Sequence, residues 1–135
     1  MKKYLLGLVV TLILLSGDSF ASSLTKKDSA IMKGEKNLLI ALNADNYGLK
    51  SSAVQILGDI KSKKAVIPLM RILKSSDDEN LRIIAAHSLY RIQSPMGMFA
   101  VRQAIRFDES SRVRKVCRNL YLDSEKQETA AAKQR

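Results

Sequence analysis

The sequence has 135 residues, of which 46% are apolar, and it carries 23 lysines and arginines against 13 aspartates and glutamates. This is the length of a single domain. The apolar content, the single cysteine and the lack of repeated long apolar runs exclude a disordered chain, a small disulfide-held domain and a polytopic membrane protein.

The amino-terminal segment 1–21 has the three parts of a secretory signal peptide. Lys2 and Lys3 form a positive start, an uncharged apolar run follows at 5–15, and Ser19 and Ala21 provide small residues for cleavage. Because a membrane-spanning helix needs about 20 apolar residues, a leader is favoured over a permanent anchor. We therefore expect cleavage after Ala21 and export to the periplasm or the outside of a bacterial cell.

The mature chain that remains after this leader, 22–135, stays basic. The leader holds two lysines and one aspartate, so its removal changes the net charge only from +10 to +9. Cys117 has no second cysteine to pair with. It is predicted to be either a buried thiol or one half of an intermolecular disulfide.

From Leu49 onward, apolar residues recur every 32 positions, as in the steps from Leu49 to Leu81 and from Leu81 to Val113. Within each copy they occupy positions i, i+4, i+7, i+8 and i+11, which correspond to one face of an α-helix. The three copies are Leu49, Ala53, Ile56, Leu57 and Ile60; Leu81, Ala85, Ser88, Leu89 and Ile92; and Val113, Cys117, Leu120 and Tyr121. A second helical series lies between them in the same register, with Val66, Leu69, Ile72 and Leu73 matching Met98, Val101, Ala104 and Ile105.

Polar turns separate the copies at the same period. Asp45-Asn46, Asp77-Asp78 and the stretch from Asp108 to Ser110 each precede a first helix. Their side chains can accept hydrogen bonds from the unpaired amides of the helix start, and their negative charge favours its dipole. Each repeat is therefore predicted to hold two helices.

The repeat resembles a known family. Five features are similar to the short HEAT repeat. Its first helix follows an acidic turn, begins with Leu or Val before Lys or Arg, has an alanine four positions later, and ends near Leu57-Gly58. Its second helix opens with Lys-Ala-Val-Ile-Pro-Leu at 64–69. This type is also called the phycobilisome-lyase-type HEAT-like repeat, and the resemblance covers about Asn37 to Leu122. Ankyrin and tetratricopeptide repeats have nearby periods, but their signature residues are absent.

The resemblance implies an all-α fold, an α-α superhelix of about two and a half 32-residue helix pairs. Because so short a stack must be closed at both ends, we expect an N-terminal capping helix over Thr25 to Leu42. The repeat domain is predicted to span 22–123. The segment 124–135 is predicted to form a flexible polar tail, since it includes no apolar residue beyond alanine.

The residues that could support catalysis have structural interpretations. His87 is the only histidine, and it aligns with the polar Gln55 and Asn119, which indicates a solvated position. Cys117 aligns with Ala53 and Ala85 on the buried face, which indicates a packed thiol. We find no motif for a cofactor, a metal or a catalytic triad, and therefore predict a protein that is not an enzyme.

Positive charge on the second helices is the feature that indicates partners. Arg71 and Lys74 lie one turn apart, and so do Arg102 and Arg106, so each pair is predicted to share an outward face. Lys74 and Arg106 are one repeat apart, which would align the pairs in a basic stripe. This stripe either binds a partner or only keeps the repeat soluble.

The leading functional hypothesis is a non-catalytic, exported scaffold that binds another protein through these four residues. The first alternative is a module that binds anionic polymers or lipid headgroups. The second is an accessory subunit of a larger enzyme complex. Self-association through an open end of the stack is also considered. Nucleic acid is disfavoured by the small number of aromatic residues and by export.

Overall fold

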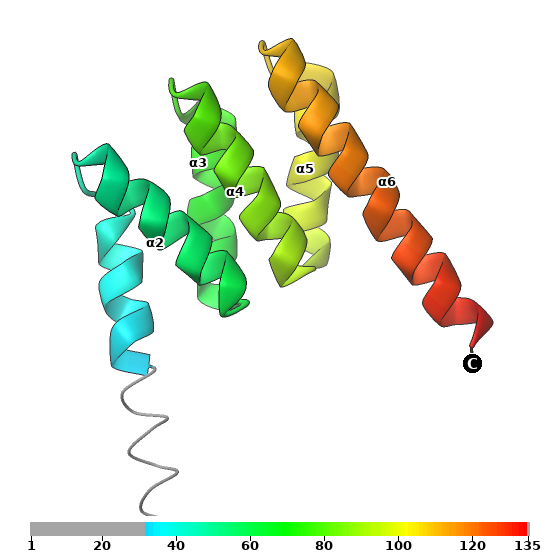
Figure 1. Cartoon of the computed structure of the whole chain (residues 1–135), viewed down its shortest axis with the longest axis horizontal. Helices are drawn as coiled ribbons and strands as arrows, with labels where there is room; N and C mark the ends of the chain where they lie inside the picture. Colours follow the sequence, from blue (N-terminus) through cyan, green and yellow to red (C-terminus); the bar gives the residue numbers. More distant parts are fainter. Residues whose placement is uncertain (1–31, 135) are drawn as a thin grey trace, which may run out of the picture. The chain divides into compact units, whose positions relative to one another are not determined.

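The computed structural model describes residues 32–134, and in this range it contains helices and no strand (Figure 1). Residues 32–41 are helical, and a short 3-10 helix, η1 (Lys63–Ala65), leads into α3. The other helices are α2 (Tyr47–Asp59), α3 (Val66–Ser75), α4 (Glu79–Ile92), α5 (Pro95–Phe107) and α6 (Ser111–Lys133). The predicted all-α fold is confirmed.

Residues 37–135 form one compact unit, in which the helices make two layers. α2, α4 and α6 lie side by side in one layer, and α3 and α5 lie side by side in the other (Figure 1). Most of the apolar series predicted from the repeat faces inward between the layers, but the prediction is wrong for Leu49, Ile56 and Ile60, which are 52%, 43% and 44% exposed and lie outside the core. Its most deeply buried large members are Leu57, Leu69, Leu89, Val101 and Val113.

Local capping explains where α2, α4, α5 and α6 begin. The side chains of Asn46, Asp78 and Ser110 accept hydrogen bonds from backbone amides in the first turns of α2, α4 and α6. These caps recur at the period of the repeat, as the sequence predicted. Ser62 and Ser94, also one repeat apart, cap η1 and α5 in the same way.

The residue before each of these serines has a left-handed backbone conformation. The φ angle is 53° at Lys61 and 55° at Gln93, and this conformation ends the preceding helix. The turn between the first and second helix of a repeat thus consists of a left-handed residue followed by a serine cap. It occurs in two successive repeats, at Lys61-Ser62 and at Gln93-Ser94.

α2 and α4 approach closely at Gly58. A Cβ atom at this position would lie 2.7 Å from the Cα atom of Ser88, so no larger residue fits without a shift. Ser88 also donates a hydrogen bond of 2.8 Å to the carbonyl oxygen of Val54. The Leu-Gly pair of the sequence therefore serves the contact between neighbouring repeats.

The last helix is longer than predicted. Residues 124–133, which we expected to form a flexible tail, continue α6 to Lys133. Glu125 and Lys126 occupy the positions of the left-handed residue and the serine cap, so the turn that ends α2 and α4 is missing from the third copy. Ser124 is buried and donates a hydrogen bond to the side chain of Gln93, which ties the extension to α4.

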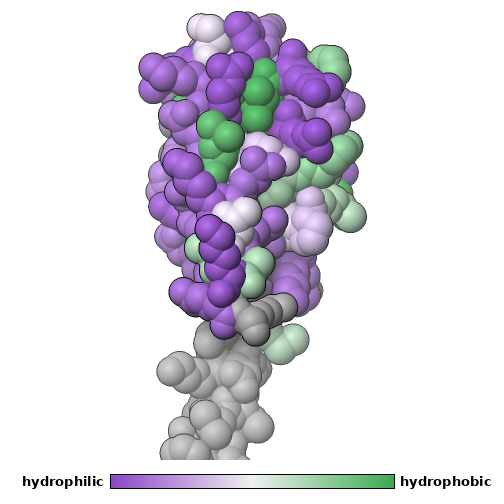
Figure 2. Space-filling model, turned by 90° about the vertical axis from the view of Figure 1, so that its right-hand side faces the viewer, coloured by the Kyte–Doolittle hydropathy of each residue, from purple (hydrophilic) through white to green (hydrophobic). Residues whose placement is uncertain are grey.

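The outer face of α6 carries charge where the equivalent faces of α2 and α4 are apolar. Val54 of α2 packs toward α4 and is fully buried, and the matching Ala86 of α4 is also fully buried. The third residue of this series is Arg118, which is exposed. Figure 2 views this side of the molecule and shows hydrophilic residues over most of it.

At the amino-terminal side, part of the predicted capping helix is described. Of the predicted range Thr25 to Leu42, residues 32–41 are helical, and Leu38, Leu39 and Leu42 belong to the core or pack against it. Residues 25–31 and the predicted signal peptide lie outside the described residues. None of the described helices is long and apolar enough to span a membrane.

Candidate functional site

A groove of about 700 Å³ lies between α3 and α5. Its floor reaches the core at Leu73 and Ala104, which are 2% and 9% exposed. Its other lining residues are Ile67, Met70, Arg71, Lys74, Ser75, Phe99, Ala100, Gln103, Phe107 and Asp108.

Large apolar side chains in this groove are exposed to solvent. Ile67 is 59% exposed, Phe99 is 57% exposed and Phe107 is 77% exposed. Clusters of exposed large apolar residues on a small protein mark surfaces that bind partners. The groove is therefore the strongest candidate for a binding site in the part of the chain that the structure describes.

The charge of the groove is positive. Arg71 and Lys74 line it from α3, and both are exposed. The one acidic lining residue is Asp108, whose side chain is 6% exposed and lies 3.0 Å from the guanidinium of Arg82. Because Asp108 is already neutralised, the two cations dominate what a ligand in the groove would meet.

The structure divides the four predicted partner-binding residues into two pairs. Arg71 and Lys74 line the groove, whereas Arg102 and Arg106 do not. The guanidinium of Arg102 lies 5.8 Å from the centre of the Tyr121 ring on α6. Lys74 lies on the side of α3 that faces α5. Its counterpart one repeat later, Arg106, lies on the side of α5 that faces away from the groove.

The sequence interpretation missed the apolar part of the groove. Phe99, Gln103 and Phe107 recur at every fourth position along one face of α5, and Ile67 lies one repeat before Phe99. These residues fall outside the buried apolar series, so they were not considered as a surface. The periodic spacing of these residues on the second helices could have indicated the groove.

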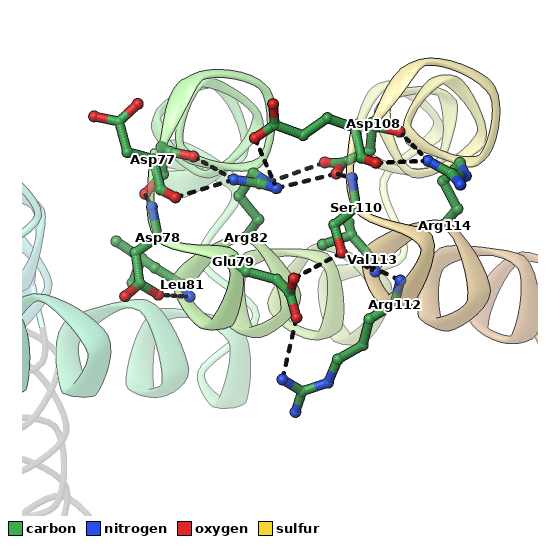
Figure 3. Close-up of polar contacts among 12 residues, drawn as sticks. Asp77, Asp78, Glu79, Leu81, Arg82, Asp108, Ser110, Arg112, Val113 and Arg114 are labelled. Carbon is green, nitrogen blue, oxygen red and sulfur yellow. Dashed lines mark hydrogen bonds and ion pairs between the residues drawn. The ribbon is translucent and has the colours of Figure 1, made fainter.

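A buried arginine joins the turns of neighbouring repeats (Figure 3). Arg82 is 4% exposed, and its Nε and Nη2 atoms donate hydrogen bonds of 3.0 and 3.1 Å to the two carboxylate oxygens of Asp108. Its Nη1 atom donates to the carbonyl oxygen of Ser76 at 2.7 Å. Burial alone would lower the pKa of Arg82, but the bond to Asp108 and the surrounding carboxylates raise it.

Arg114, one repeat after Arg82, also binds a turn. It donates hydrogen bonds of 2.7 and 2.8 Å to the carbonyl oxygens of Asp108 and Glu109, and so contacts the backbone of the acidic turn and not its carboxylates (Figure 3). Glu79 accepts hydrogen bonds from Ser110 and Arg112 across the same junction. These polar contacts hold the repeats together, and of their residues only Asp108 lines the groove.

The two residues with catalytic potential lie where the sequence predicted. His87 is exposed, and partial desolvation together with the charge of Arg91 lowers its pKa. Cys117 is fully buried, and burial, followed by the charge of Asp108, raises its pKa to about 12. Within residues 32–134 no group of three or more histidine, cysteine or acidic side chains could hold a metal ion.

Comparison with protein families agrees with this architecture. The family model described as HEAT repeats matches residues 35–120, which is more than half of the chain. The chain belongs to the HEAT repeat family. HEAT repeats generally serve as scaffolds for protein interaction and are typically non-catalytic. Among curated proteins, no relative matches the chain.

In HEAT-repeat terms, α2, α4 and α6 are the first helices of successive repeats, and α3 and α5 are the second helices. The family match at 35–120 agrees closely at both ends with the predicted range of Asn37 to Leu122. The groove therefore lies on the second-helix layer of the HEAT stack.

Proposed function

We propose that this HEAT-repeat protein is an exported, non-catalytic scaffold that binds another protein in the groove between α3 and α5. The observation that carries the proposal is the exposure of Ile67, Phe99 and Phe107 around a groove whose floor reaches the core. Leaving these side chains in water is unfavourable, and a partner that covers them removes this cost. The family's general role in protein interaction supports the same conclusion.

The chemistry of the groove favours binding over catalysis. The only histidine and the only cysteine of the chain are not among its lining residues. Its polar side chains are two cations, a serine, a glutamine and an aspartate already bonded to Arg82. None of these side chains is an activated nucleophile or a well-placed general base.

Site-specific photo-crosslinking in intact cells tests the binding face. A photoreactive phenylalanine analogue at Phe99 should give a defined crosslinked product, because this side chain lies in the groove. The same analogue at Gln55, an exposed residue of α2 in the other layer, is the control and should give none. Crosslinking at Gln55 with none at Phe99 would place the partner on the opposite face and reject the proposed site.

The export part of the proposal rests on the leader at 1–21. Cell fractionation of the full-length protein should recover it outside the cytoplasm, with Ser22 as the first residue on amino-terminal sequencing. A variant with Ala21 replaced by a bulky residue, Ala21→Trp, should keep its leader, because cleavage needs a small residue there. A full-length cytoplasmic protein in the wild type would contradict export.

A further inference from the structure

The groove between α3 and α5 has the length of a short helix. Ile67 and Phe99 hold the same position in successive repeats, near the start of α3 and of α5, and Phe107 lies at the end of α5. Phe99 and Phe107 are eight positions apart, and at about 1.5 Å per residue this corresponds to roughly 12 Å. A partner helix of two to three turns therefore spans the groove.

The side chains of the groove fit one face of such a helix. An amphipathic helix presents apolar residues at spacings of three, four and seven positions, and these residues insert between two parallel ridges. Here the ridges are α3 and α5, and the floor between them contains the nearly buried Leu73 and Ala104. The apolar face of a helix would cover Ile67, Phe99 and Phe107 together.

The charges of the groove select the polar edge of that helix. Arg71 and Lys74 lie on the same helix one turn apart, and neither forms an ion pair within residues 32–134. Asp108 offers no competing negative charge, because Arg82 binds both of its oxygens. We propose that the groove binds an acidic amphipathic helix of a partner protein, with its carboxylates beside Arg71 and Lys74. This inference rests on the proposed scaffold function and names the chemistry of the partner.

The shape of the groove favours a protein segment over a membrane surface. A bilayer is wide compared with the space between two helices, so it cannot reach a floor at Leu73 and Ala104. A single helix can reach it. Anionic lipid would meet the cations but leave the floor of the groove uncovered.

Peptide binding to the purified mature protein, residues 22–135, tests the proposal. The probe is a fluorescent helical peptide of about four turns with leucines on one face and glutamates along its edge. The comparison peptides carry lysines in place of the glutamates, or the same residues in scrambled order. We expect the acidic peptide to bind at least about tenfold more tightly than either comparison peptide, and its affinity to fall with added salt.

Matched variants separate the groove from general charge. The double variant R71E/K74E should weaken binding of the acidic peptide by about tenfold or more and improve binding of the lysine peptide. The double variant R102E/R106E changes the net charge equally but lies outside the groove, and it should leave binding within about twofold of the wild type. Phe99→Ala should weaken binding of the acidic peptide by more than about tenfold, as expected for a central apolar anchor.

Three results would overturn the inference. The first is equal binding of the acidic and lysine peptides, and the second is an equal loss in the two charge-reversal variants. The third is binding to vesicles that contain an anionic lipid without binding to the acidic peptide. In each of these cases a crosslink at Phe99 in cells would still support the scaffold itself, so the two proposals can fail separately.

Discussion

At the scale of single residues, burial decides which polar groups are structural. Arg82 is the clearest example, because it is nearly inaccessible yet fully hydrogen-bonded to Asp108 and to the turn that precedes α4. The neighbouring cations of the groove are exposed and have no such partners within residues 32–134. Arg82 thus serves the fold, whereas Arg71 is exposed in the groove where the proposed partner would bind.

Replacement of Arg82 should destabilise the fold strongly. Arg82→Ala removes the cation and leaves the carboxylate of Asp108 buried, which typically costs about 3 kcal/mol or more in the free energy of unfolding. Arg114→Ala removes only hydrogen bonds to carbonyl oxygens and should cost about 1 kcal/mol. Urea unfolding of the two variants measures both values. Similar losses in the two variants would show that the buried Arg82–Asp108 pair contributes no more to the free energy of unfolding than the contacts of Arg114.

Cys117 should make the fold sensitive to alkaline pH. Its thiol has a pKa of about 12 in the folded chain, raised from 9.0 by burial, so folding favours the protonated form. The stabilisation is complete below about pH 9 and is lost as the pH rises toward about 12, by at most about 1.4 kcal/mol per pH unit. Unfolding in urea near pH 8 and near pH 10.5 should show a larger loss for the wild type than for Cys117→Ala. An equal loss would show that Cys117 is not the group responsible.

At the scale of helices, contacts between neighbours depend on small residues and on the turn that ends each first helix. Gly58 allows α2 to approach Ser88, and the turns at Lys61-Ser62 and Gln93-Ser94 direct the chain into the second layer. Where the third copy lacks this turn, the helix continues. With Glu125 and Lys126 in place of this turn, α6 runs past the position where α2 and α4 end.

Enlarging Gly58 should separate α2 from α4. The new methyl group of Gly58→Ala would lie 2.7 Å from the backbone of Ser88, so the helices must shift, and we expect a loss of about 1–3 kcal/mol in the free energy of unfolding. Gly34→Ala is the control, because its new methyl group would meet no atom within 4 Å. This control should be neutral or slightly stabilising, since alanine favours helix. Thermal unfolding distinguishes the two, and equal melting temperatures would refute the close contact.

At the scale of the whole molecule, the sequence predicted the stack well because its determinants are local and periodic. The caps at Asn46, Asp78 and Ser110 and the buried apolar series both follow from spacing alone. The groove was harder to predict, because Phe99 and Phe107 are exposed and do not belong to the buried series. The spacing also grouped Arg102 and Arg106 with Arg71 and Lys74, because alignment of the repeats does not show which helix each side chain faces.

The charged outer face of α6 should disfavour self-association through that face. Lys115 and Arg118 lie on α6 at the positions of Ile83 and Ala86 in α4, and both are exposed. The double variant K115I/R118A restores the apolar residues of the preceding repeat, so it should promote stacking of one molecule on another. Sedimentation velocity at micromolar concentration would detect this association. A variant that remains as monomeric as the wild type would show that the charge does not close the stack.

Binding of a partner in the groove between α3 and α5 can be measured residue by residue with an amide chemical-shift map of the mature protein. The partner recovered by crosslinking, or the acidic helical peptide, would be titrated into isotope-labelled protein. We expect the largest shifts to cluster at residues 67–75 and 99–108, with little change at Gln55 and Asn119. Shifts concentrated on the outer face of α6 or on α2 and α4, with the groove unchanged, would contradict this expectation.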